Sequence, residues 1–142
     1  MATIINRLEY KQRYNNCNQG LFILFNEKRF PKGQSVVNLG VALSEKLYLL
    51  PLEERINSVT SILFSLIQPY AAVSLTHIEL LFTDYLRLDV IRTLLSMCRN
   101  RKICLVWPGE QMDNRLIYAT PNMPEYYECD ITSLQDTYIV TE

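Results

Sequence analysis

This chain of 142 residues has few metal-ligating side chains, almost no net charge and no long apolar run. Its single histidine and four cysteines contain no C-x-x-C pair, which indicates neither a zinc site nor a disulfide framework, so we expect no metal and no cofactor. A formal charge of −1 gives no global attraction to a polyanion, and any nucleic-acid contact must therefore be local.

The sequence also lacks the segments that direct a protein to a membrane. No apolar run approaches the roughly 20 residues that a membrane-spanning helix requires. The amino terminus has no charged stretch followed by an apolar one, as a secretory signal would have. We therefore expect a cytoplasmic protein with no membrane contact, folded as a single α/β domain over residues 1–142.

The stretch from Ala72 to Gly109 dominates the hydrophobic pattern. Two near-continuous apolar runs, 73–75 and 103–107, flank a helical span over roughly 85–99 that is long enough for a crossover. One stripe of this helix collects the apolar side chains Leu86, Val90, Ile91, Leu94, Leu95 and Cys98. The pattern predicts a β-α-β unit within a three-layer α/β fold that has a mostly parallel sheet and flanking helices.

The segments on either side predict further elements of the same fold. Those before the central unit are an amphipathic helix over about 4–15, a central strand at 21–25, a loop at 26–34, a strand at 35–39, a short helix from Gly40 and a helix from Pro51 to Pro69. Those after it are short strands at 116–119, 126–131 and 137–140. We interpret these last strands as edge elements, because prolines punctuate this part of the chain.

Several segments carry a resemblance to a known family. They are Ser35 to Leu47, Val73 to Phe82, Arg99 to Arg101 leading to Trp107-Pro108-Gly109, Leu116 to Pro121, and Pro124-Glu125-Tyr126. In this order, over roughly residues 20–130, the chain resembles the BrxF family of small P-loop proteins of type 3 BREX bacteriophage-defence systems. The resemblance implies a reduced P-loop-ATPase-like core that works beside other components of a defence operon.

The chain departs from that family where the nucleotide would bind. A phosphate loop of the form G-x-x-x-x-G-K-[ST] wraps phosphates with backbone N–H groups, neutralises them with lysine and holds magnesium through its hydroxyl. Residues 26–35 contain one late glycine, Gly33, with Lys32 before it, and they are too few for a crossover helix. We therefore expect no Walker A loop, and no helix longer than one turn over 26–34.

Three other positions named by the resemblance bear on catalysis. Thr76 stands where a magnesium-binding aspartate is implied, and a hydroxyl holds a hard cation poorly. Pro108 stands where a polar sensing residue is implied. Glu79 survives where a water-orienting acid is implied, but a solvated carboxylate is the simpler interpretation, because an acid without substrate or metal has nothing to act on. These vestigial positions favour a pseudo-ATPase without catalytic residues.

Lys28, Arg29 and Lys32 form a basic cluster in the loop over 26–34. They could contact the phosphate of a nucleotide or of a nucleic acid, although a cluster of three charges is usually only solvated. A nucleic-acid-binding accessory protein that uses this loop is therefore one alternative function. An NTP-binding protein with a non-standard phosphate site is another.

Tyr118, Tyr126 and Tyr127 are candidates for partner contact, because aromatic residues are enriched at interfaces, but they could equally pack within the fold. Our leading hypothesis is a non-catalytic, pseudo-ATPase interaction subunit of a BREX-like anti-phage defence system. Its expected partners are other proteins of the operon, with at most weak nucleic-acid contact.

Overall fold

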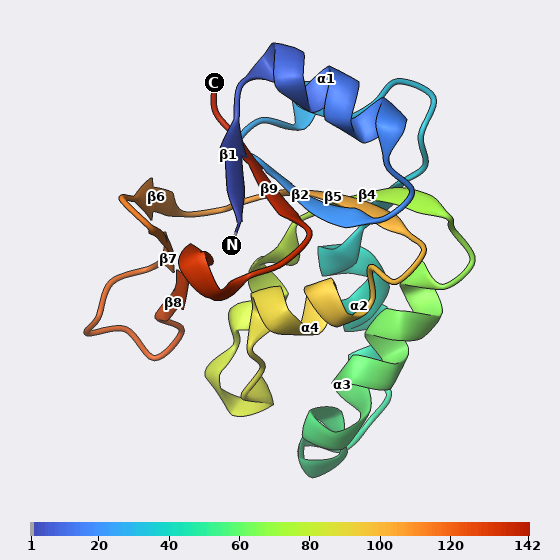
Figure 1. Ribbon diagram of the computed structural model, residues 1–142. Helices are drawn as coiled ribbons and strands as arrows, with labels where there is room; N and C mark the ends of the chain where they lie inside the picture. Colours follow the sequence, from blue (N-terminus) through green and yellow to red (C-terminus); the bar gives the residue numbers. More distant parts are fainter. Residues whose placement is uncertain (1) are drawn as a thin grey trace.

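The computed structural model describes residues 2–142, in which a six-stranded sheet is joined to a smaller three-stranded sheet (Figure 1). The large sheet has the order β1-β9-β2-β5-β4-β3, and each neighbouring pair of strands is parallel. Its strands are β1 (Thr3–Ile5), β2 (Gly20–Leu24), β3 (Val36–Asn38), β4 (Ala72–Thr76), β5 (Lys102–Val106) and β9 (Thr137–Val140). The predicted α/β class with a mostly parallel sheet is confirmed.

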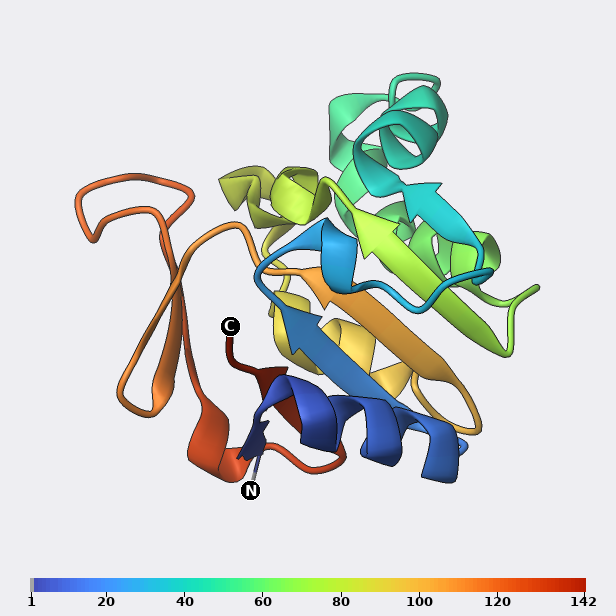
Figure 2. The same ribbon diagram turned by 90° about the horizontal axis from the view of Figure 1, so that it is seen from above.

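Helices cover both faces of this sheet. One face is covered by α1 (Arg7–Asn16), as the view in Figure 2 shows from the side of that helix. The other face is covered by α2 (Leu39–Leu47), α3 (Leu52–Ile67) and α4 (Val90–Ser96) (Figure 1). The arrangement of helix, sheet and helices is consistent with the three layers that the sequence predicts.

Alternate side chains of the central strands point into two separate cores on opposite faces of the sheet, as the two-residue period of a strand requires. Phe22, Leu24 and Cys104 point toward α1 and pack with its tyrosines. Leu21 and Ile23 point to the opposite face and pack with the helices there. Because both faces are buried, β2 is apolar throughout, and its predicted central position is confirmed, as are those of β4 and β5.

The small sheet is inserted between β5 and β9. It is antiparallel, with the order β6-β7-β8, and its strands are β6 (Glu110–Met112), β7 (Arg115–Tyr118) and β8 (Tyr127–Asp130). The prediction that the late strands are edge elements is wrong for two of them. β7 lies in the middle of the small sheet, and β9 lies inside the large sheet between β1 and β2, where its side chains are mostly buried.

The predicted helix over 4–15 is wrong at its start. Ile4 and Ile5 belong to β1, and α1 begins at Arg7 after Asn6, which exchanges capping hydrogen bonds with Glu9. The buried face of α1 is formed by Tyr10 and Tyr14, whereas Leu8 is 68% exposed. The strand that pairs with Ile4 and Ile5 is β9, which lies far away in the sequence, so the local pattern could not reveal the pairing.

The predicted helix over 85–99 is also shorter than expected. Arg87 adopts a left-handed conformation with φ 53°, which ends a 3-10 segment over Asp84–Leu86. Asp89 then caps the start of α4 by accepting from the N–H of Arg92, and the helix ends after Ser96. Most of the predicted apolar stripe is buried, although Leu95 is only half-buried.

Among residues 2–142, no helix combines the length and the apolar character needed to cross a lipid bilayer.

Candidate functional site

The crossover from β2 to β3 contains only one helical turn, a 3-10 segment over Glu27–Arg29. The prediction of no longer helix over 26–34 is confirmed. Backbone N–H groups of this loop donate within the loop itself: those of Lys28 and Arg29 to Asn26, that of Phe30 to Glu27 and that of Gln34 to Pro31, at 2.9 to 3.4 Å. These donors are therefore occupied and cannot also wrap a phosphate.

The late glycine of the loop does not supply a phosphate cradle either. Gly33 adopts φ 78°, and a Cβ placed on it meets no atom within 4 Å. Glycine is needed here because the backbone is left-handed, and no neighbouring atom makes a close approach.

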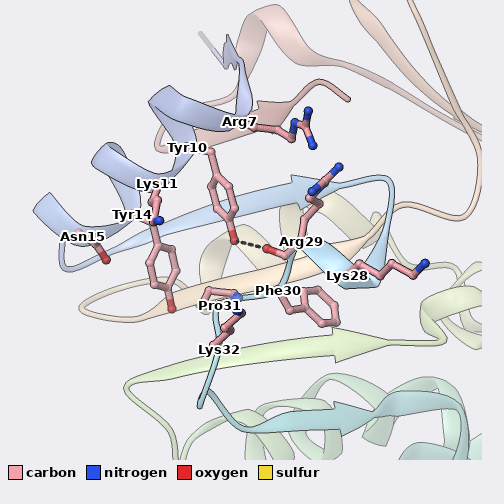
Figure 3. Close-up of a pocket in the computed structure, with 10 residues that line it drawn as sticks. All are labelled: Arg7, Tyr10, Lys11, Tyr14, Asn15, Lys28, Arg29, Phe30, Pro31 and Lys32. Atoms are coloured by element: carbon pink, nitrogen blue, oxygen red, sulfur yellow. Dashed lines mark hydrogen bonds between the residues drawn. The ribbon is translucent and has the colours of Figure 1, made fainter.

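A cleft of about 440 Å³ lies between α1 and this loop (Figure 3). Among the described residues its lining includes five cations and no acid; the cations are Arg7 and Lys11 of α1 and Lys28, Arg29 and Lys32 of the loop. We call this site the cationic cleft. The structure thus brings the predicted basic cluster together and adds a second wall, α1, that the sequence prediction missed. The available signal was the four-residue spacing of Arg7, Lys11 and Asn15 along α1.

Tyr10 and Tyr14 form the floor of the cationic cleft, and each is only 8% exposed. The Tyr10 hydroxyl donates to the backbone carbonyl oxygen of Arg29 at 3.0 Å and so ties the loop to α1 (Figure 3). Burial raises the pKa of both phenols, because desolvation disfavours the charged form. Both side chains are therefore neutral at physiological pH.

The hydroxyl of Tyr14 is buried and has no hydrogen-bond partner within residues 2–142. Its ring points from α1 toward Pro31 and Lys32 (Figure 3). The ring is also held by Lys102, whose Nζ lies 4.0 Å from the ring centroid and donates to the Tyr14 carbonyl oxygen at 2.9 Å. An unpaired buried hydroxyl costs about 1–3 kcal/mol. Because this hydroxyl is shielded from solvent, a ligand in the cleft does not reach it without a shift of the loop or of α1.

Glu142 reaches the cationic cleft through Arg29. Its Oε2 lies 3.3 Å from Nε of Arg29, and both side chains are partly exposed. An ion pair of this kind is worth about 0–1 kcal/mol, so it leaves Arg29 available to a more highly charged anion. In the part of the chain that the structure describes, Arg7, Lys11, Lys28 and Lys32 form no ion pair.

The three positions that the resemblance names lie elsewhere, at or just beyond the carboxyl ends of β4 and β5. Thr76 is the buried last residue of β4, Glu79 is exposed in the 3-10 segment over Ile78–Phe82, and Pro108 is half-buried after β5. None of them lines the cationic cleft. Within residues 2–142 there is no group of three or more His, Cys, Asp or Glu side chains that could hold a metal ion.

Tyr118 and Tyr127 belong to an aromatic cluster between the two sheets. Phe82 stacks on Tyr118 with ring centroids 4.3 Å apart, and it meets Trp107 and Tyr127 edge-on at 5.5 and 5.3 Å. Trp107 is buried, whereas both tyrosines are half-buried. Much of their surface is therefore used inside the protein.

The hydroxyls of Tyr126 and Tyr127 also bond within the protein. Tyr127 donates to Oδ1 of Asp89 at 2.6 Å and accepts from the N–H of Ile91 at 3.2 Å, which ties β8 to the start of α4. Burial is the main reason that the pKa of Tyr127 is raised. Tyr126 is half-buried and donates to Oε2 of Glu128 at 2.5 Å. Partner contact through these tyrosines stays a prediction.

The Trp-Pro-Gly motif has a structural role. Nε1 of Trp107 donates to the carbonyl oxygen of Ile117 in β7 at 3.1 Å. A Cβ placed on Gly109 would lie 1.9 Å from that same oxygen, so this close approach requires glycine. The motif therefore docks the small sheet against the end of β5.

A second surface that the sequence prediction missed lies where α2 meets α3. Four large apolar side chains are exposed there, and we call them the α2–α3 tip: Tyr48, Leu49, Leu52 and Ile56. Leu49 is 81% and Tyr48 75% exposed. The connection is held in place by Arg55, which donates to the carbonyl oxygen of Leu50 at 3.1 Å and lies over the Tyr48 ring. Large apolar side chains that stay exposed so close together in the sequence make this junction a candidate interaction site.

Comparisons of the chain with protein-family models, with curated proteins and with solved structures found no match.

Proposed function

We propose that this protein is a non-catalytic interaction subunit of a BREX-like anti-phage defence system, in which a reduced P-loop-ATPase-like core serves as a cytoplasmic docking scaffold. The observation that carries the proposal is the β2–β3 crossover, which has no glycine-lined phosphate loop and in which four N–H groups, those of Lys28, Arg29, Phe30 and Gln34, are bonded inside the loop. A core without a phosphate cradle has no means of holding a nucleotide in the manner of P-loop proteins. Its contribution then lies in its surfaces.

The α2–α3 tip is the surface that best supports docking of a partner protein. Its side chains are exposed although they are apolar, and a partner that covered them would remove that area from water, at about 25 cal/mol for each Å². The expected partners are the other protein components of the defence operon. The tyrosines Tyr118 and Tyr127 are less suited to this role because their rings pack against Phe82.

We expect Mg-ATP and Mg-GTP to bind more weakly than about 1 mM, which corresponds to about 4 kcal/mol of binding free energy. The reason is that Thr76 replaces the implied magnesium ligand and the loop N–H groups are already occupied. Isothermal titration calorimetry with the purified protein measures this directly. Micromolar binding, or hydrolysis that Glu79→Gln abolishes, would favour the alternative of an NTP-binding protein with a non-standard phosphate site.

We expect Leu49→Asp combined with Leu52→Asp to weaken partner capture by about 2 kcal/mol or more, since truncation at the centre of an interface has effects of this size. Co-purification of the tagged protein with the products of its native operon, read by mass spectrometry, measures the capture. The matched control is Leu8→Asp with Met112→Asp, which places the same charges on apolar residues that are exposed away from the α2–α3 tip. Equal capture by both double variants would show that the tip is not the docking surface.

A further inference from the structure

The cationic cleft concentrates charge in a chain that is nearly neutral overall. Five of the 14 lysines and arginines line it, whereas the remaining nine share the rest of the surface with 15 acidic residues. Attraction to an anion is therefore confined to this site, where low-dielectric walls concentrate the field. The ligand chemistry that fits such a site is anionic.

Two of the cations and one amide form a row along the α1 wall of the cleft. Arg7, Lys11 and Asn15 follow one another at four-residue intervals along α1, and each interval corresponds to a rise of about 6 Å. The loop supplies the opposite wall, and Figure 3 shows the side chains of Arg7 and Arg29 pointing toward one another across the cleft. Cations that are distributed over both walls of an elongated helix-and-loop site match a chain of regularly spaced anions.

The floor of the cationic cleft is aromatic and narrow. Tyr10 and Tyr14 lie beneath the cations, and Phe30 is half-buried beside them. The hydrogen bond from Tyr10 to the Arg29 carbonyl oxygen fixes the separation of the two walls. A basic groove with aromatic side chains is the usual means by which proteins hold single strands of nucleic acid. Phe30 is the partly exposed aromatic side chain here, whereas Tyr10 and Tyr14 are each only 8% exposed and support the cleft from beneath.

We propose that the cationic cleft binds the sugar-phosphate backbone of a single strand of nucleic acid. Arg7 and Lys11 contact phosphates from the α1 wall, and Arg29 and Lys32 contact them from the loop. The N–H groups of Lys28, Arg29, Phe30 and Gln34 are bonded inside the loop, so recognition is chiefly by side-chain charge and is independent of base sequence. This binding does not depend on the proposed role in protein docking.

The ion pair between Glu142 and Arg29 competes with the binding of an anion at this site. Its carboxylate occupies Arg29 at 3.3 Å, and an incoming phosphate must displace it. Glu142→Gln keeps the shape of the side chain but removes the competing charge, and we expect it to raise the affinity for a single strand about twofold to threefold. This expected increase in affinity distinguishes Glu142→Gln from the variants that remove cations, which are expected to lower the affinity.

The test is fluorescence anisotropy of labelled decamers of oligo-dT and oligo-rU with the purified protein, at two or more salt concentrations. Lys11→Glu combined with Lys32→Glu is expected to lower the affinity about tenfold or more and to make the salt slope shallower by about 1.4, because two phosphate contacts are lost. The matched control is Lys46→Glu with Arg99→Glu, which changes the net charge equally at exposed residues outside the cleft. This control is expected to lower the affinity less than threefold.

The comparison of oligo-dT with oligo-rU shows whether the strand is DNA or RNA. A duplex of the same length and a poly-glutamate peptide serve as competing ligands, and both are expected to bind at least about fivefold more weakly than the single strand. Equal binding of the duplex or of poly-glutamate would overturn the proposal. So would equal losses in the two double variants, or the absence of binding to either decamer at low salt, with circular dichroism showing intact folds. The purified protein is used alone, so these outcomes are separate from partner capture.

Discussion

Replacing Gly109 by alanine is expected to lower the free energy of unfolding by about 3 kcal/mol. The added Cβ would lie 1.9 Å from the carbonyl oxygen of Ile117, and the obstructing atom belongs to the backbone of β7, which cannot move without shifting the small sheet. That shift would also stretch the hydrogen bond that Trp107 donates to the same oxygen. Chemical denaturation followed by circular dichroism measures the loss.

Gly33→Ala is the matched control for Gly109→Ala. Gly33 has open space around its Cβ position, but its φ of 78° is unfavourable for alanine, so a cost of about 1 kcal/mol is expected. A Gly109→Ala protein as stable as the Gly33→Ala protein would contradict the structural role given to the Trp-Pro-Gly motif.

Phe22→Ala is expected to lower the free energy of unfolding by about 3–5 kcal/mol, the usual range for a buried phenylalanine. Phe22 is fully buried and stacks on Tyr138 with ring centroids 4.9 Å apart. It also meets Tyr14 and Tyr10 at 5.2 and 5.8 Å. The cavity left by alanine would open beneath α1, because this ring packs against both buried tyrosines of that helix.

Phe64→Ala provides the comparison on the opposite side of the protein. Phe64 lies on α3, is 43% exposed and loses chiefly the contact with the Arg101 guanidinium, so we expect a cost below about 1 kcal/mol. Thermal and urea unfolding of the two variants measure the difference. Similar losses in both would show that the core under α1 contributes little to stability.

The central part of the fold follows directly from the sequence because it depends on local patterns. β2, β4 and β5 are near-continuous apolar runs, and such runs indicate strands that are buried on both faces. β9 begins with Thr137 and Tyr138 and is less apolar, and its interior place depends on β1, a three-residue strand that pairs with it from far away in the sequence. A pairing across so many residues leaves no local trace, so the local pattern predicts that the two isoleucines of β1 belong to the neighbouring helix.

The candidate site is likewise only partly predictable from local patterns in the sequence. Lys28, Arg29 and Lys32 are close in the sequence, so their cluster was visible without a structure. Arg7 and Lys11 join them only because α1 packs over β2, beside the loop that leaves that strand. The α2–α3 tip was missed for a different reason, since an apolar residue on an expected helix is normally taken to face the core.

The strand order β1-β9-β2 bears on how the chain folds during synthesis. β1 is synthesised long before β9, its neighbour in the sheet. The core beneath α1 includes both Ile5 and Val140, so on the ribosome it cannot close until β9 has emerged. β2, β5 and β4 can pair before that, and α1 packs fully only when β9 joins the sheet.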